Sequence, residues 1–102
     1  MYLYNVTYNV EPDVVENWLK WMKSFYIPEV MKMGYFSEFK IFKLLNEVPD
    51  STGVTYTIQY FTQSIDHVES YLEKHAGKMV ELHNSKYKDK HVSFRTLLQE
   101  ID

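Results

Sequence analysis

Residues 18–30 read Trp-Leu-Lys-Trp-Met-Lys-Ser-Phe-Tyr-Ile-Pro-Glu-Val, and both tryptophans of the chain lie in this segment. Its apolar residues recur at helical spacing, and further aromatic residues widen the stripe to a second side of the predicted helix. Pro28 predicts that this helix ends near Ile27, with a short second turn from 28 to 33 that Gly34 closes. A helix that is apolar on two sides needs cover from a subunit, a ligand or the same domain.

Segments with strand patterns surround this helix. Residues 2–10 alternate apolar and polar side chains, and Glu11-Pro12-Asp13 then opens the helix. Ser64 is the predicted N-cap of a second long helix, in which Gly77 marks a kink or a close approach. The other predicted elements are strands at 36–45, 54–61 and 91–98, a polar loop at 46–53, and the second helix from 64 to about 87.

The predicted order is β-α-β-β-α-β, which indicates an α+β protein with a ferredoxin-like βαββαβ fold. We expect a four-stranded antiparallel sheet with both helices on one face. The length of 102 residues suits a single domain spanning 1–102.

The uncovered face of this sheet predicts a homodimer. The strands at 36–45 and 91–98 place apolar residues on both faces, unlike the clean alternation of a sheet with one solvated face. Aromatic residues form 17% of the chain, more than one small core can bury. We therefore expect two copies to pair sheet against sheet as a dimeric α/β barrel.

Composition excludes several classes of function. The net charge is −3 without a basic cluster, which argues against nucleic-acid binding. There is no cysteine and no long apolar run, so we expect no membrane segment and a cytoplasmic location. The histidines at 67, 75, 83 and 91 are eight apart and cannot share a helix face, so no metal site is expected. No cofactor is predicted, although haem, which needs one histidine, stays open.

The candidate site residues are polar groups near the predicted core. His83 and His75 lie beside the apolar stripe of the second helix, where a histidine acts as a base or simply completes a core. Arg95 is expected on the polar side of the sheet with Asn5, either paired with Glu29 or anchoring a substrate carboxylate. The predicted walls of a pocket between the first helix and the sheet are Trp18, Trp21, Tyr26, Tyr56 and Tyr60.

Several motifs resemble a bacterial family of uncharacterised proteins, the domain-of-unknown-function family 4286. They are Tyr4-Asn5-Val6-Thr7, Trp18-Leu19-x-Trp21-Met22, Ile27-Pro28-Glu29-Val30, Gly34-x-Phe36, Thr55-Tyr56-x-x-Gln59-Tyr60, His83 and Phe94-Arg95-Thr96-Leu97. The resemblance implies a ferredoxin-like fold in the dimeric α/β barrel group and favours His83 over His75. A histidine often precedes Ile-Pro-Glu-Val in the family, whereas this chain has Tyr26.

Three functions remain open at this point. The first is a small dimeric barrel protein that binds an apolar or aromatic molecule between the first helix and the sheet. The second is a cofactor-independent monooxygenase-like or isomerase-like enzyme, with His83 as acid or base and Arg95 orienting the substrate. The third is a structural dimeric interaction module without a ligand. Fold alone does not choose among them.

Overall fold

The structure is a computed structural model that describes residues 1–49 and 52–102. The predicted polar loop at 46–53 therefore includes two residues, Asp50 and Ser51, outside the described part. The strands are β1 (Tyr2–Val10), β2 (Glu38–Lys43), β3 (Val54–Thr62) and β4 (His91–Gln99). The helical segments are α1 (Val15–Trp21), η1 (Met22–Tyr26), α2 (Ile27–Lys32), α3 (Ile65–Tyr71), η2 (Leu72–Ala76) and α4 (Gly77–Lys86).

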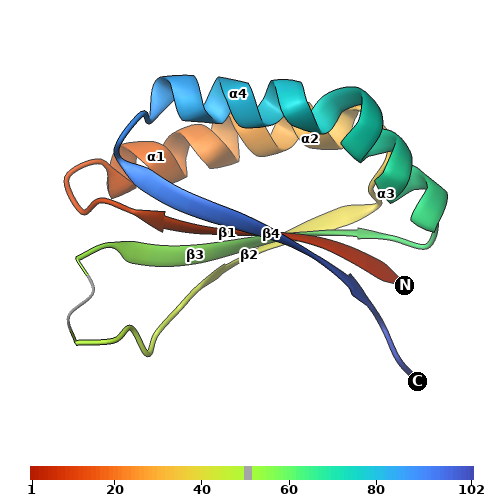
Figure 1. The fold of residues 1–102 in the computed structure, drawn as a ribbon, viewed down its shortest axis with the longest axis horizontal. Coiled ribbons are helices and arrows are strands. Elements are labelled where there is room, and N and C mark those ends of the chain that lie inside the picture. Colours follow the sequence, from red (N-terminus) through yellow and green to blue (C-terminus); the bar gives the residue numbers. More distant parts are fainter. Residues whose placement is uncertain (50–51) are drawn as a thin grey trace.

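The four strands form one antiparallel sheet in the order β2-β3-β1-β4. The helices lie together on one face of it, and the opposite face is left open (Figure 1). This arrangement confirms the predicted ferredoxin-like α+β fold. The alternation of β1 explains the two faces, because Tyr4, Val6 and Tyr8 are buried under the helices while Asn5 and Thr7 point the other way.

The helical segments join into two long helices, each with a π-helical turn near its middle. In the first, the N–H of Ile27 bonds to the carbonyl oxygen of Met22, five residues back. The wide turn accommodates Pro28, which lacks an N–H, so residues 15–32 form one helix. The predicted break at Pro28 is therefore wrong. Gly34 does end the helix, with a φ of 86° that favours glycine.

The second helix begins and bends as its sequence indicates. Ser64 accepts a hydrogen bond from the N–H of His67, which confirms the predicted N-cap. Gly77 follows the second π-helical turn, so the interruption lies where the glycine suggested. The predicted close approach at Gly77 is wrong, because, apart from its chain neighbours and the backbone of its own helix, no atom of the described residues lies within 4 Å of the place a Cβ would take.

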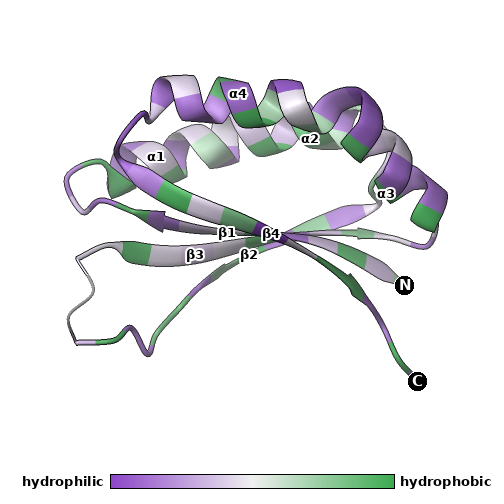
Figure 2. Ribbon diagram, in the orientation of Figure 1, coloured by the Kyte–Doolittle hydropathy of each residue, from purple (hydrophilic) through white to green (hydrophobic). Residues whose placement is uncertain are grey.

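The core lies between the helices and the sheet and is rich in aromatic rings. β4, one of the two edge strands, carries both hydrophobic and hydrophilic residues along its length (Figure 2). Within the described residues, no helix is both long and apolar enough to cross a membrane.

Candidate functional site

His83 of α4 and Trp18 of α1 meet in the buried core. The indole Nε1–H of Trp18 donates a 2.8 Å hydrogen bond to Nε2 of His83, and both side chains are buried. Rings of Tyr8, Tyr26 and His91 pack around the imidazole at centroid distances of 4.7, 5.7 and 4.4 Å. His83 is therefore a packed core residue bonded to a side chain.

The protonation of His83 follows from this geometry. Nε2 of His83 accepts a hydrogen bond from the indole N–H, so the neutral imidazole must carry its own proton on Nδ1. This Nδ1 is buried without a hydrogen-bond partner. Burial lowers the pKa of His83 to about 4, and the nearby His91 adds to the lowering. In this arrangement the lone pair that a base would use is already engaged by Trp18.

The space predicted for a pocket between the first helix and the sheet is filled by rings. Trp18 packs against Tyr8 and Tyr56 at 5.3 and 5.5 Å, and Trp21 packs against Tyr26 at 5.4 Å. Tyr26 also donates a 3.0 Å hydrogen bond to the carbonyl oxygen of Met79, which ties the two helices together. Trp21 borders a hollow on the helix surface beside Lys20 and Lys86.

Two other predicted residues lie apart from His83. Tyr60 is buried; its ring stacks against Tyr4 and packs at a tilt against Phe36. His75 lies in η2, near the middle of the second helix, with Nε2 3.3 Å from the hydroxyl of Tyr35. The structure thus brings Trp18, Trp21 and Tyr26 to His83 but leaves His75 and Tyr60 in a separate group.

Arg95 lies on the face of the sheet opposite to the one predicted. The β1–β4 register pairs it with Val6, which puts its side chain on the helix-facing side, away from Asn5. Its partly buried Nε–H donates a 3.2 Å hydrogen bond to the hydroxyl of Tyr4. The prediction misplaced Arg95 because the alternation of residues 91–98 does not reveal which face the helices cover.

Glu29 does not pair with Arg95 within the described chain. Its carboxylate bonds to Lys32 at 2.7 Å on the surface of α2. Continuation of the helix through Pro28 keeps Glu29 on that helix, so the predicted acid beside the polar side of the sheet is wrong.

Of the buried tyrosines near Arg95, Tyr26 was among the predicted site residues, whereas Tyr4, Tyr8 and Tyr71 were not. Burial raises the pKa of Tyr4, Tyr8, Tyr26 and Tyr71, and in each the charge of Arg95 opposes that rise. The phenols therefore stay protonated at neutral pH and surround the cation with neutral groups. The alternation of residues 2–10 signalled that Tyr4 and Tyr8 point into the core, but only the fold places them beside Arg95.

A small cleft opens where the helix layer meets the edge of β4, and its lining begins at Leu97, two residues beyond Arg95. Leu97 is paired with Tyr4 and faces the helix side, yet it is 50% exposed, so this edge is incompletely covered. The cleft has a volume of about 140 Å³ and a mainly apolar lining. It is lined by Tyr2, Leu3, Ile65, Val68, Leu97, Leu98 and Gln99.

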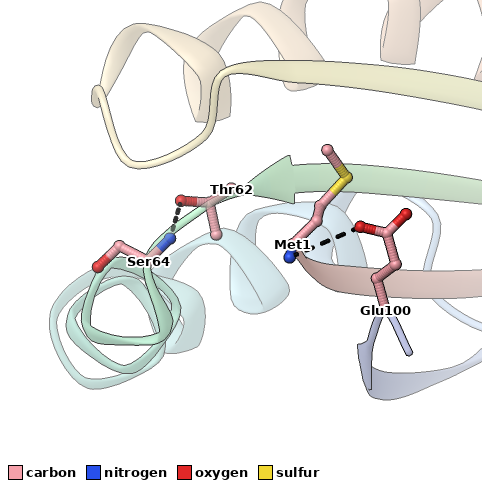
Figure 3. Close-up of polar contacts among 4 residues, drawn as sticks. All are labelled: Met1, Thr62, Ser64 and Glu100. Atoms are coloured by element: carbon pink, nitrogen blue, oxygen red, sulfur yellow. Dashed lines mark hydrogen bonds and ion pairs between the residues drawn. The ribbon is translucent and has the colours of Figure 1, made fainter. Parts of the chain in front are cut away.

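The strand ends around this cleft are held by polar contacts. The N-terminal ammonium of Met1 lies 3.8 Å from the carboxylate of Glu100, and the Thr62 hydroxyl accepts a 3.1 Å hydrogen bond from the N–H of Ser64 (Figure 3). The first contact joins the ends of β1 and β4, and the second fixes the start of α3 against the end of β3. The cleft therefore lies between well-anchored elements.

The open face of the sheet has a polar centre and apolar flanks. Asn5 is 9% exposed and donates to the Thr7 hydroxyl, while its Oδ1 is buried without a partner. Phe42 on β2 and Phe94 on β4 are 49% and 62% exposed at the two edges. Among the described residues, no group of three or more His, Cys, Asp or Glu is arranged to hold a metal ion.

One family model matches residues 1–101 of the chain. The chain belongs to the domain of unknown function family DUF4286. Membership confirms the resemblance seen in the sequence and assigns no activity. No functionally curated protein has a significant sequence match to this DUF4286 chain.

Solved structures share the fold of this DUF4286 chain at low sequence identity. A dimeric ferredoxin-like protein from an uncultured marine organism is 12% identical with a TM-score of 0.70, and the match covers 100% of this chain and 96% of that one. An ethyl tert-butyl ether D (EthD) family protein from Bacillus halodurans is 13% identical with a TM-score of 0.68, covering 99% and 100%. SnoaB, a cofactor-independent oxygenase from Streptomyces nogalater, is 14% identical with a TM-score of 0.56, covering 99% and 93%. At these identities the likeness concerns the fold alone.

Proposed function

We propose that this protein is a homodimeric binding protein that holds a small apolar or aromatic molecule in the cleft at the edge of β4. The observation that carries the proposal is the exposure of Leu97 on the helix-facing side of the sheet, beside an apolar cavity of about 140 Å³. A cavity of about 150 Å³ lined by apolar side chains is large enough for benzene. The site thus differs from the predicted one, which lay beneath the first helix.

The test is to block the mouth of the cleft. Ile65 lines it and is 38% exposed, so Ile65→Trp is expected to fill the cleft without damaging the core. Leu82 is also 38% exposed and does not line this cleft, so Leu82→Trp is the matched control. Titration with indole, followed by amide NMR shifts, is expected to show saturable binding to the native chain and Leu82→Trp only. Equal binding to both variants would contradict the proposed site.

Dimerisation is proposed through the open sheet face. Its exposed apolar residues lie at both edges, and a second copy turned to face it would cover them symmetrically. Phe94→Lys is expected to give monomers in sedimentation at micromolar concentration, because it puts charge into the contact without touching the core. Phe25→Lys, on the helix surface, is expected to leave dimers intact. A monomeric native chain would overturn this part of the proposal.

A second candidate is an interaction module without a ligand. The hydrogen bond between Trp18 and His83 favours it, because both side chains are buried and bonded to each other within the core. This candidate predicts the same dimer with no saturable binding in the cleft. The enzyme alternative, a cofactor-independent monooxygenase or isomerase, is supported by likeness of fold. Its proposed base, His83, would have to break its hydrogen bond with Trp18 before Nε2 could accept a proton.

A further inference from the structure

Arg95 is the single arginine of the chain, and its side chain lies between the helices and the sheet. A guanidinium has five N–H donors in a planar fork, of which the Tyr4 hydroxyl accepts the one on Nε. A partly buried cation is normally neutralised by a carboxylate. The residues around Arg95 therefore decide what the remaining donors bind.

The described part of the chain supplies no carboxylate to Arg95. Its ion pairs join Met1 to Glu100, Lys32 to Glu29 and Lys90 to Asp13. The phenols that interact electrostatically with Arg95 remain neutral, and His83 is neutral as well. The proposed dimer contact is on the other face of the sheet, so it does not bring an acid of the second copy to this cation.

Arg95 and the cleft are on the same side of the sheet, and Leu97 connects them along β4. Leu97 is two residues further on the same face, about 7 Å away along β4, and it lines the cleft together with Val68 of α3. Tyr4, which is paired with Leu97, reaches back to Arg95 through its hydroxyl. The guanidinium donor group and the apolar cleft therefore lie near one another on the helix-facing side of β4.

We propose that the natural ligand is a small carboxylic acid with an aromatic or compact aliphatic body, whose carboxylate pairs with the guanidinium of Arg95 while its body fills the cleft. Arginine suits this role because its fork binds both oxygens of a carboxylate. Tyr4 acts as a positioning residue: its hydroxyl accepts a hydrogen bond from the Nε–H of Arg95 and so fixes the guanidinium. The inference rests on the proposed function, since it gives the chemical class of the molecule bound at that site.

The single arginine makes the test direct, because the chain has one Nε–Hε signal in its nitrogen-15 NMR spectrum. Phenylacetate and phenylacetamide share shape and differ in charge. Titration with phenylacetate is expected to shift the Arg95 signal saturably, with affinity about ten- to a hundredfold above that of phenylacetamide. Arg95→Gln is expected to remove this preference while phenylacetamide still binds.

Two further variants complete the experiment. Lys40→Gln removes an equal charge from the open face of the sheet and is expected to leave phenylacetate binding unchanged. Arg95→Lys keeps the charge without the fork and is expected to retain only part of the preference, which gives a second reading should Arg95→Gln fold poorly. Equal affinities of the native chain for acid and amide, or native acid binding by Arg95→Gln, would overturn the inference alone. Absence of binding by acid, amide and indole would overturn the proposed function together with it.

Discussion

Trp18 and His83, 65 residues apart in the sequence, are joined by a 2.8 Å hydrogen bond from the indole Nε1–H to the imidazole Nε2. The bond links the first helix to the second within the buried aromatic layer. It gives the buried indole N–H an acceptor and fixes which imidazole nitrogen carries the proton. Nδ1 of the imidazole is left without a hydrogen-bond partner.

Trp18→Phe is expected to lower the free energy of unfolding by about 2–4 kcal/mol, because it leaves Nε2 of His83 buried without a donor and opens a cavity. Trp21→Phe, in the same helix, is the matched control and is expected to cost less, since Trp21 is only partly buried. Urea unfolding followed by circular dichroism measures both. Equal losses would contradict a specific role for the bond.

Stability is expected to fall in mild acid because of His83. Its pKa is about 4 in the folded chain against an ordinary value of 6.5, so between these values the unfolded chain binds a proton that the folded chain does not. The free energy of unfolding should therefore decrease as the pH drops from 6.5 to 4, by up to about 3 kcal/mol from this residue.

His83→Gln isolates the contribution of His83 to this pH dependence. Glutamine can still accept a hydrogen bond from the indole N–H but does not titrate in this range. The comparison is the difference in unfolding free energy between neutral and mildly acid pH, native chain against variant. The unfolding free energy of the variant should depend less steeply on pH than that of the native chain. An identical slope would show that other groups cause the loss in acid.

The π-helical turn in the first helix predicts an unusual tolerance to deletion. The buried residues of the first helix are Trp18, Met22, Tyr26, Ile27 and Val30, and the step from Met22 to Ile27 is five residues, within η1, between steps of four and three. Deleting Ser24 restores spacings of four, four and three, which suit an unbroken α-helix with one buried face.

Deleting Lys20 in α1 is the control, because it rotates Trp18 by about 100° relative to the rest of the buried face. We expect the Ser24 deletion to remain folded and to be more stable than the Lys20 deletion by at least about 2 kcal/mol, the value of one buried side chain. Thermal unfolding of the two variants decides it. If the Ser24 deletion were less stable than the Lys20 deletion, the π-helical turn itself would be required for the helix to pack on the sheet.

The sequence by itself determined the fold class, because the alternation in residues 2–10 and 54–61, the helix cap at Ser64 and the glycine at 34 are local signals of local backbone geometry. It also placed His83 and Trp18 near the core. Their direct bond could not be predicted, since it depends on how two helices pack and on the rotations that the π-helical turns introduce.

Tertiary structure alone decided the face of Arg95. A strand alternates without showing which side the helices cover, and a shift of one residue in the register exchanges the two sides. Pairing with Val6 put Arg95 under the helices beside Tyr4, and it left Glu29 on a helix surface with Lys32. The candidate site therefore arises from long-range strand pairing, whereas the elements that carry it arise from local sequence.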